Sequence, residues 1–474
     1  MIAGRALSRL AGLLALAVLS AVGYPGGAGP AAAALLGHGG PVQAVDVSAD
    51  GRHALTGGFD YTVILWDLET QVPVRIMTGH DGGVSAVRFV PGSALRGVSA
   101  GDDGDVILWD LHAGRVLHRM KGHRLRAVGL AVSPDGRLAA SAGWDGTVRV
   151  WDLETGSQRH VFETRANRIN TVAFAGGGAQ VLAGDEAGQL LVWPVDTGEA
   201  MQPLRVHDFV VNALAVADPA SASTTLATAS VDRTMRLWSW PAREELVSIE
   251  LHDAAVLALA ISGDGSLLAS SGADGAIRLW SIPDGRPAGT LEGHAGAVFA
   301  LAFAPGGERL LSAGRDESVR VWNLAGGTEI APAGATNIPA PETVAGMTEA
   351  EKRGQWEFRK CRICHSITAE GENRAGPTLY GIVGRVAGTV PGYDYSPALT
   401  DKGIVWTPDM IARLFADGPD RVTPGSKMPL QKLSSPQARD DLIAYIEKVT
   451  APKPGVPVPG RMADGPSAGE GAKQ

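Results

Sequence analysis

Short apolar runs that end in tryptophan dominate the first two thirds of the chain. Val63–Asp67 and Val148–Asp152 are examples, and both are rich in β-branched residues. Turn sequences such as the Ser-Pro-Asp-Gly segment at Ser133–Gly136 separate these runs from their neighbours. Short β-branched runs bounded by Gly, Pro and Asp are typical of β-strands. The pattern therefore predicts many short strands joined by tight turns.

This strand pattern repeats with a nearly constant period. Seven tryptophans recur at spacings of 42 to 45 residues: Trp66, Trp109, Trp151, Trp193, Trp238, Trp280 and Trp322. Seven units of this length resemble WD40 repeats, each of which forms one blade of a β-propeller. The resemblance implies an all-β, seven-bladed propeller over residues 31–325.

Polar residues at fixed positions extend the resemblance to the WD40 family. An aspartate stands six residues before the tryptophan in six repeats: Asp60, Asp103, Asp145, Asp232, Asp274 and Asp316. Serine or threonine stands ten residues before it: Thr56, Ser99, Ser141, Thr228, Ser270 and Ser312. A histidine lies near each repeat start: His38, His80, His123, His207, His252 and His294. The resemblance implies a buried hydrogen-bonded chain from Trp through Ser or Thr and His to Asp, which gives every buried polar group a partner.

The fourth repeat departs from this pattern and keeps only its tryptophan, Trp193. Ala187, Ala183 and Arg165 stand where the other repeats have Asp, Ser or Thr, and His, and Pro194 follows the tryptophan. Because all three polar residues are replaced together, no partial network with unpaired buried polar groups remains. We therefore expect a fourth blade with less polar packing.

The WD40 resemblance also implies how the ring closes, because such rings usually combine both chain ends in one blade. Residues 31–37 would supply the outer strand of the blade that contains Trp322. Cleavage of a leader after Ala34 would cut into that strand and is not expected.

The N-terminus has the features of an export signal. Arg5 and Arg9 precede an apolar run of 13 residues, Leu10–Val22, and small residues follow. This run is too short for a comfortable transmembrane helix. Residues 1–30 are therefore expected to direct the chain to the periplasm, and their retention as a membrane anchor is the alternative.

The pattern changes after the last tryptophan repeat. Residues 326–346 are rich in Ala, Gly and Pro and are expected to form a linker. Residues 347–450 show helical patterning, with helix starts at Thr348 and at Ser435, the second helix running to about Val449. Residues 451–474 are rich in Pro and Gly and are predicted to be disordered.

The charge is distributed unevenly along the 474 residues, whose net charge is −8. Residues 31–325 hold 23 basic and 33 acidic side chains, whereas residues 347–450 hold 14 and 13. No basic face emerges, so we expect no nucleic-acid partner.

The chain contains only two cysteines, and they stand together in the sequence Cys361-Arg362-Ile363-Cys364-His365. A disulfide or a redox dithiol is the alternative reading of such a pair. The adjacent histidine favours covalent attachment of a c-type haem. Two thiols about one helical turn apart can add to the haem vinyl groups, and the imidazole then reaches the iron.

The region around this motif resembles the class I, mitochondrial-like cytochromes c along its full length. The segments that carry the resemblance are Gly376-Pro377, Leu379–Gly381, Gly384-Arg385, Pro391–Tyr393, Tyr395, Gly403–Trp406, Pro424–Pro429 and Asp441–Tyr445. The resemblance implies an all-α domain over residues 347–450 with one covalent haem c. It also implies that Tyr395 and Trp406 hold a haem propionate, and that the carbonyl of the residue beside Pro377 orients His365. Phe358 and Tyr445 are expected to pack where the first and last helices cross.

The second axial ligand is expected to be Met428. His365 is the only histidine after His294, so this region cannot supply a second imidazole. Met347 precedes the haem motif, Met410 lies in a helical pattern and Met462 lies in the expected disordered tail, whereas Met428 stands in a proline-bounded loop, as the family ligand does. Imidazole and thioether together fill both axial positions. Such an iron has no open position for a substrate, which favours electron transfer over catalysis.

The propeller sequence shows no catalytic pattern. His53, His112, His118 and His160 lie outside the repeat network and have no metal-ligand spacing with carboxylates. We expect an interaction platform for a redox partner protein, with membrane contact only if the leader is retained. The alternative is a periplasmic haem oxidoreductase whose propeller binds a substrate or a second cofactor. Fold alone cannot name the partner.

Overall fold

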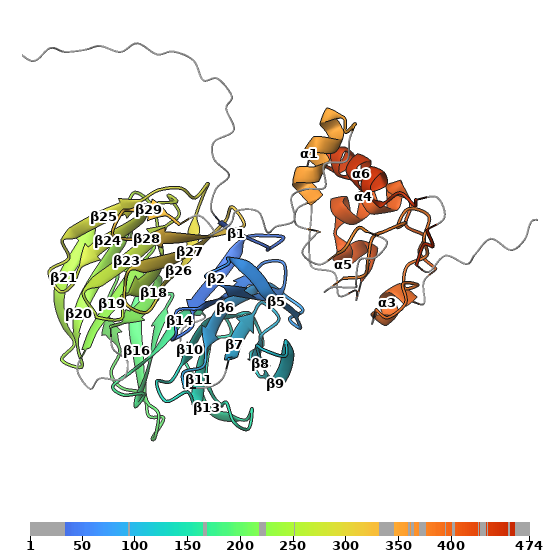
Figure 1. Ribbon diagram of the computed structural model, residues 1–474. Coiled ribbons are helices and arrows are strands. Elements are labelled where there is room, and N and C mark those ends of the chain that lie inside the picture. The colour runs from blue at the N-terminus through green and yellow to red at the C-terminus, as the bar shows by residue number, and fades with distance from the viewer. Residues whose placement is uncertain are drawn as a thin grey trace, which may run out of the picture. The chain divides into compact units, whose positions relative to one another are not determined.

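The computed structural model describes residues 34–92, 95–164, 168–217, 224–250, 252–330, 346–358, 361, 365–368, 376–393, 395–400, 403–424, 426, 433, 435–453 and 456–459. The first part, up to residue 330, consists of antiparallel sheets, and the later part consists of helices and loops (Figure 1). None of the helices in the described ranges is long and apolar enough to cross a membrane.

The first part is a seven-bladed β-propeller, as the tryptophan period predicted. Blades one to three contain β2 (Val42–Val47), β3 (His53–Gly58), β4 (Thr62–Asp67) and β5 (Val72–Thr78); β6 (Val84–Phe89), β7 (Arg96–Gly101), β8 (Asp105–Asp110) and β9 (Arg115–Lys121); and β10 (Ala127–Val132), β11 (Leu138–Gly143), β12 (Thr147–Asp152) and β13 (Gln158–Glu163). Blades four and five contain β14 (Ile169–Ala175), β15 (Gln180–Asp185), β16 (Gln189–Pro194) and β17 (Leu204–Arg205); and β18 (Val211–Val216), β19 (Thr224–Ser230), β20 (Thr234–Trp240) and β21 (Glu244–Glu250). Blade six contains β22 (Val256–Ile261), β23 (Leu267–Gly272), β24 (Ile277–Ser281) and β25 (Pro287–Leu291).

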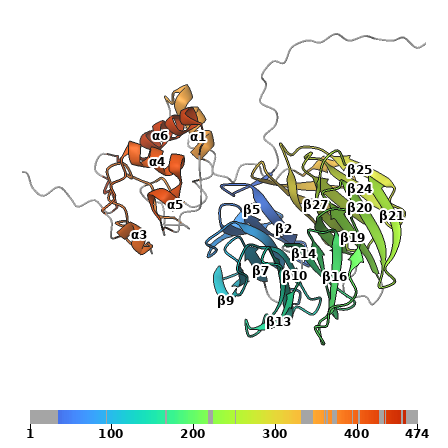
Figure 2. The same cartoon turned by 180° about the vertical axis from the view of Figure 1, so that it is seen from behind.

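The inner strands of neighbouring blades lie side by side and close the ring (Figure 2). The inner strand of each blade contacts the inner strand of the next blade. The series begins at β2, continues through β6, β14 and β22, and ends at the inner strand of blade seven, which contacts β2 again. Apolar side chains from facing sheets fill the space between blades. The core is therefore divided among the blade interfaces, as expected for a radial repeat.

Blade seven is built from both ends of the propeller sequence. It contains β26 (Val298–Phe303), β27 (Arg309–Gly314) and β28 (Ser318–Asn323), and β1 (Ala34–Leu36) pairs antiparallel with β28. This confirms the predicted closure. A second short strand, β29 (Thr328–Glu329), pairs with the other end of β28 and lies within the segment that the sequence suggested as linker.

The predicted polar chain is present in five blades. In blade three, Trp151 Nε1 donates to Ser141 Oγ at 2.8 Å, which lies 2.7 Å from His123 Nε2, and His123 Nδ1 lies 3.0 Å from Asp145 Oδ1. Blades one, two, five and seven repeat this arrangement. The spacing in the sequence therefore predicted these contacts correctly.

Blade six differs because an arginine enters the polar chain. Arg278 Nη1 lies 2.8 Å from His252 Nδ1 and 2.7 Å from Asp274 Oδ2, while His252 Nδ1 and Asp274 Oδ2 are 3.5 Å apart. A guanidinium can only donate, so His252 Nδ1 accepts and Nε2 carries the proton that is directed to Ser270. The imidazole of blade six thus takes the opposite tautomer to that of blades in which Nδ1 donates to aspartate.

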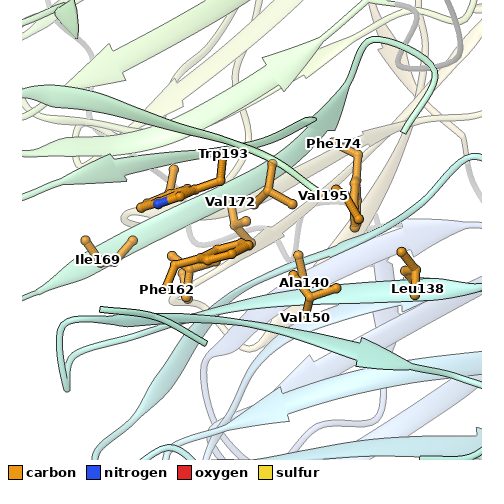
Figure 3. Packing of buried hydrophobic residues seen from close by; sticks show 13 residues of the cluster. Leu138, Ala140, Val150, Phe162, Ile169, Val172, Phe174, Trp193 and Val195 are labelled. Carbon is orange, nitrogen blue, oxygen red and sulfur yellow. The ribbon is translucent and has the colours of Figure 1, made fainter. Parts of the chain in front are cut away.

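Blade four packs through aromatic rings, in line with its expected loss of polar members (Figure 3). The rings of Phe162 and Trp193 stack with centroids 5.0 Å apart and planes inclined by 7°. The His160 ring also stacks on Phe162. Ala187 cannot tie the turn as aspartate does elsewhere. Asp185 replaces that function, because its carboxylate accepts from the backbone N–H groups of Ala187 and Gln189 at 2.9 and 2.8 Å. Arg165 lies outside the described residues.

The later part contains α1 (Glu349–Phe358), α3 (Pro397–Thr400), α4 (Pro408–Asp417), α5 (Pro419–Val422) and α6 (Pro436–Thr450). α1 begins with a reciprocal cap, in which Thr348 Oγ1 accepts from Glu351 N–H and Glu351 accepts from Thr348 N–H. Ser435 caps α6, as predicted, by accepting from Ala438 N–H. Helices α1, α4 and α6 share one apolar core, in which the ring centroids of Phe358 and Tyr445 lie 5.2 Å apart where α1 packs on α6.

Candidate functional site

The candidate site begins where α1 ends. Cys361 is buried. The N–H of His365 donates to the Cys361 carbonyl at 2.8 Å, and this bond between residues four positions apart is the one that closes an α-helical turn. Cys361 and His365 are therefore held on adjacent turns of the backbone. Arg362, Ile363 and Cys364 lie outside the described residues.

His365 is oriented by a backbone carbonyl. Its Nδ1 lies 2.7 Å from the carbonyl oxygen of Pro377. Because a carbonyl can only accept, Nδ1 carries the proton and Nε2 presents a lone pair. Burial lowers the pKa of the imidazole, and the hydrogen bond to Pro377 only partly opposes that effect. The result is a neutral imidazole, the form that binds a metal.

The carbonyl that orients His365 lies one residue away from the predicted one. We expected the carbonyl of the residue beside Pro377 to orient His365, but the carbonyl of Pro377 itself does so. Gly376 instead provides the space, because a β-carbon at this position would lie 2.3 Å from His365 Cε1. The imidazole thus packs against a backbone that has no side chain to displace it.

The loop that follows Pro377 is held by a buried arginine. Arg385 is 3% exposed, and its guanidinium donates to the carbonyls of Thr378 and Tyr380 at 2.7 and 2.9 Å. Burial lowers the pKa of Arg385, and the nearby phenol of Tyr395 opposes that effect. Within the described part of the chain, no carboxylate forms an ion pair with Arg385. A buried cation of this kind favours an anionic group beside it.

Arg385 is related to each of the two aromatic residues expected to hold a propionate, to Trp406 through the backbone and to Tyr395 through its charge. The backbone N–H of Trp406 donates to the Arg385 carbonyl at 2.9 Å, and Trp406 is half-buried. Burial raises the pKa of Tyr395, whereas the charge of Arg385 lowers it. The sequence did not identify Arg385 as a site residue, although its place in the Gly384-Arg385 pair could have suggested it.

These observations fit a haem. A neutral imidazole with Nε2 as the available nitrogen suits an axial ligand, and a buried guanidinium near a phenol suits a carboxylate-bearing ring edge. Two of the expected sulfur atoms, that of Cys364 for haem attachment and that of Met428 for iron ligation, lie outside the described residues.

The propeller offers no comparable centre in the described ranges. No group of three or more His, Cys, Asp or Glu side chains there is placed to hold a metal ion. His118 Nε2 lies 3.1 Å from the Glu154 carbonyl, and His160 stacks on Phe162. His118 and His160, two of the four histidines outside the repeat network, thus have structural contacts.

The family model described as "WD domain, G-beta repeat" matches six segments, residues 31–67, 71–110, 114–152, 198–239, 243–281 and 285–323. The repeat that contains Trp193 falls between the third and fourth matches, in agreement with its altered residues.

Curated cytochromes are similar to about a fifth of the chain. Cytochrome c2 of Rhodopila globiformis is 46% identical over 87 residues, which is 18% of this chain and 80% of the relative. Cytochrome c2 of Agrobacterium tumefaciens (strain II Chrys) is 41% identical over 105 residues, or 22% of this chain and 94% of the relative. Cytochrome c of Trypanosoma brucei brucei is 49% identical over 77 residues, or 16% of this chain and 82% of the relative.

Proposed function

We propose that this chain, which belongs to the cytochrome c family and carries WD40 repeats in the same polypeptide, transfers single electrons outside the cytoplasm through one covalent haem c. The observation that carries the proposal is the contact between His365 and Pro377. It provides a neutral imidazole whose Nε2 is the nitrogen available to an iron. When bound, a haem c supplies an iron that takes up and releases one electron at a time.

Four residues would hold the haem. Cys361 and Cys364 would form the thioether bonds, and His365 and Met428 would be the axial ligands. Cys361 and His365 already lie one helical turn apart. His365 and Met428 together would raise the reduction potential of the iron and would leave it no position for a substrate.

The propionate end of the haem would lie at Arg385, Tyr395 and Trp406. Arg385 is buried, fixed by two carbonyls and electrostatically coupled to the Tyr395 phenol. A propionate there would balance a charge that has no carboxylate partner among the described side chains. We therefore add Arg385 to the two residues expected from the sequence.

The propeller would serve as the platform for a redox partner protein. Its described side chains form no metal-binding group, and its polar histidines are committed to the blade networks. We place it at residues 31–325, the haem domain at residues 347–450 and an export signal at residues 1–30, with a periplasmic location. A retained leader would add a membrane anchor.

The test compares two methionine variants of the full chain. Met428→Ala should lower the midpoint reduction potential, because the iron loses its thioether ligand. Met410→Ala, which changes a methionine on α4, should leave the potential near that of the wild type. Equal potentials in Met428→Ala and the wild type would rule out Met428 as the ligand.

A further inference from the structure

The chain beyond α6 returns to the loop that orients His365. Residues 451–453 and 456–459, here called the C-terminal strap, belong to the segment expected to be disordered. The N–H of Lys453 donates to the phenol oxygen of Tyr380 at 2.7 Å, and the N–H of Val456 donates to the Lys453 carbonyl at 3.1 Å. The strap therefore has its own turn and a defined attachment to the loop.

A second attachment lies one residue further along the loop. The N–H of Gly381 donates to the carbonyl of Thr450, the last residue of α6, at 2.7 Å. The side chain of Val458 covers Gly381 closely, since a β-carbon on Gly381 would lie 2.4 Å from Val458 Cγ1. Tyr380, Gly381 and the strap thus form one packed unit, in which Tyr380 is 2% exposed.

The opposite end of the same loop faces the haem site. The Pro377 carbonyl lies at His365, and the N–H of Leu379 donates to the carbonyl of Ser366 at 2.8 Å. Only Thr378 and Leu379 separate Pro377 from Tyr380. A displacement of Tyr380 must therefore be absorbed within two residues or reach the Pro377 carbonyl.

We propose that the C-terminal strap positions His365 through this loop and thereby sets the reduction potential of the haem. Tyr380, Lys453 and Val458 are positioning residues, since they act through Pro377 and not on the iron. The inference rests on the proposed function for the haem itself. It concerns a segment outside the region expected to form the cytochrome fold.

The direction of the effect follows from the hydrogen bond at Nδ1. An acceptor held firmly at this nitrogen increases the basicity of the imidazole, which stabilises the oxidised iron more than the reduced iron. A loosened strap lets the Pro377 carbonyl move and weakens that hydrogen bond. The midpoint potential should then rise.

The test uses the full chain with the double substitution Tyr380→Phe and Val458→Ala. The first change removes the phenol oxygen that accepts from Lys453, and the second trims the side chain over Gly381. Tyr445→Phe is the matched control, because it removes a buried phenol from the same core at α6, away from the strap. Two quantities are measured in each protein, the midpoint potential and the hydrogen–deuterium exchange rate of the Leu379 N–H.

The proposal predicts a higher potential and faster Leu379 exchange in the double variant, with neither change in Tyr445→Phe. An unchanged potential in the double variant, with or without faster exchange, would overturn it. An equal rise of the potential in Tyr445→Phe would also overturn it, because the effect would then be general loosening of the core. A wild-type chain without covalent haem would refute the proposed function instead, and the exchange rates would still show whether the strap holds the loop.

Discussion

The Nδ1 atom of His365 lies 2.7 Å from the carbonyl oxygen of Pro377. The preceding residue, Gly376, has no side chain, so the imidazole can pack directly against its backbone. The hydrogen bond to Pro377 determines both the tautomer and the direction of the ring. The geometry of the imidazole is therefore set by backbone atoms of a neighbouring loop and does not depend on the Cys361–His365 segment alone.

Replacing Gly376 by alanine should disturb this arrangement. The new β-carbon would lie 2.3 Å from His365 Cε1, so either the imidazole or the loop must move, and the Nδ1 hydrogen bond to Pro377 should be disturbed. We expect less haem per chain and a shifted midpoint potential, measured by absorption spectroscopy and redox titration. Gly263→Ala is the control, because nothing lies within 4 Å of a β-carbon there. Wild-type values in Gly376→Ala would show that the loop yields without affecting the ligand.

The indole hydrogen bonds of the blades should have a measurable effect on stability. Trp151→Phe removes the indole N–H that donates to the buried Ser141 hydroxyl, while the Ser141–His123 contact remains, and this loss should cost about 1–3 kcal/mol beyond the lost volume. Trp193→Phe removes the same volume in blade four, where Ala183 provides no hydroxyl. Calorimetric unfolding of both variants should show the larger loss for Trp151→Phe. Equal losses would mean that the polar chain contributes little.

Closure of the ring depends on β1. Leu35 is 1% exposed and packs among the residues between blades seven and one. Leu35→Ala should lower the free energy of unfolding of the propeller by about 2–5 kcal/mol. Val74→Ala on the outer strand of blade one, where the side chain is 39% exposed, should change it little. Similar thermal transitions in the two variants would show that β1 is dispensable for closure.

The propeller should lose stability in acid. Burial opposes ionisation of Asp145 and Asp316, but hydrogen bonds and charge from His123 and His294, together with backbone and hydroxyl hydrogen bonds, outweigh it and lower both pKa values below 3.8. A lowered folded-state pKa stabilises the fold above the unfolded pKa, and this stabilisation is lost as the pH falls through the folded value. Burial lowers the pKa of His207 below 6.5, so its contribution is lost first, as the pH falls from about 6.5.

Asp185 should show the opposite sign. Burial raises its pKa above 3.8, so its protonation stabilises the fold as the pH falls through that raised value. Denaturation between pH 7 and 3 should therefore become less steeply pH-dependent in Asp145→Asn and more steeply so in Asp185→Asn. The same pH dependence in both variants would contradict these pKa shifts.

The sequence predicted the features that repeat or that lie close together along the chain. The seven blades follow from the tryptophan period, and the contact from Trp151 to Ser141 follows from their constant separation of ten residues. The closing strand β1 and the cap at Ser435 were also predicted correctly. In each case a local spacing or a family pattern contains the necessary information.

Features that depend on segments meeting in space could not be predicted in this way. The entry of Arg278 between His252 and Asp274 requires knowing that one side of β24 faces the histidine. The contact of Lys453 with Tyr380 joins residues 73 positions apart, and no periodicity relates them. Cys364 and Met428, outside the described residues, remain predictions from the motif and the resemblance.

The most direct test of the central claim is the mass of the intact, denatured wild-type chain after export, combined with the absorption spectrum of its pigment. We predict a mass increased by one haem that stays attached after denaturation, and a spectrum of haem c alone. A chain with an unmodified mass would contradict the covalent haem, and a second haem type in the spectrum would contradict the electron-carrier function in favour of a haem oxidoreductase.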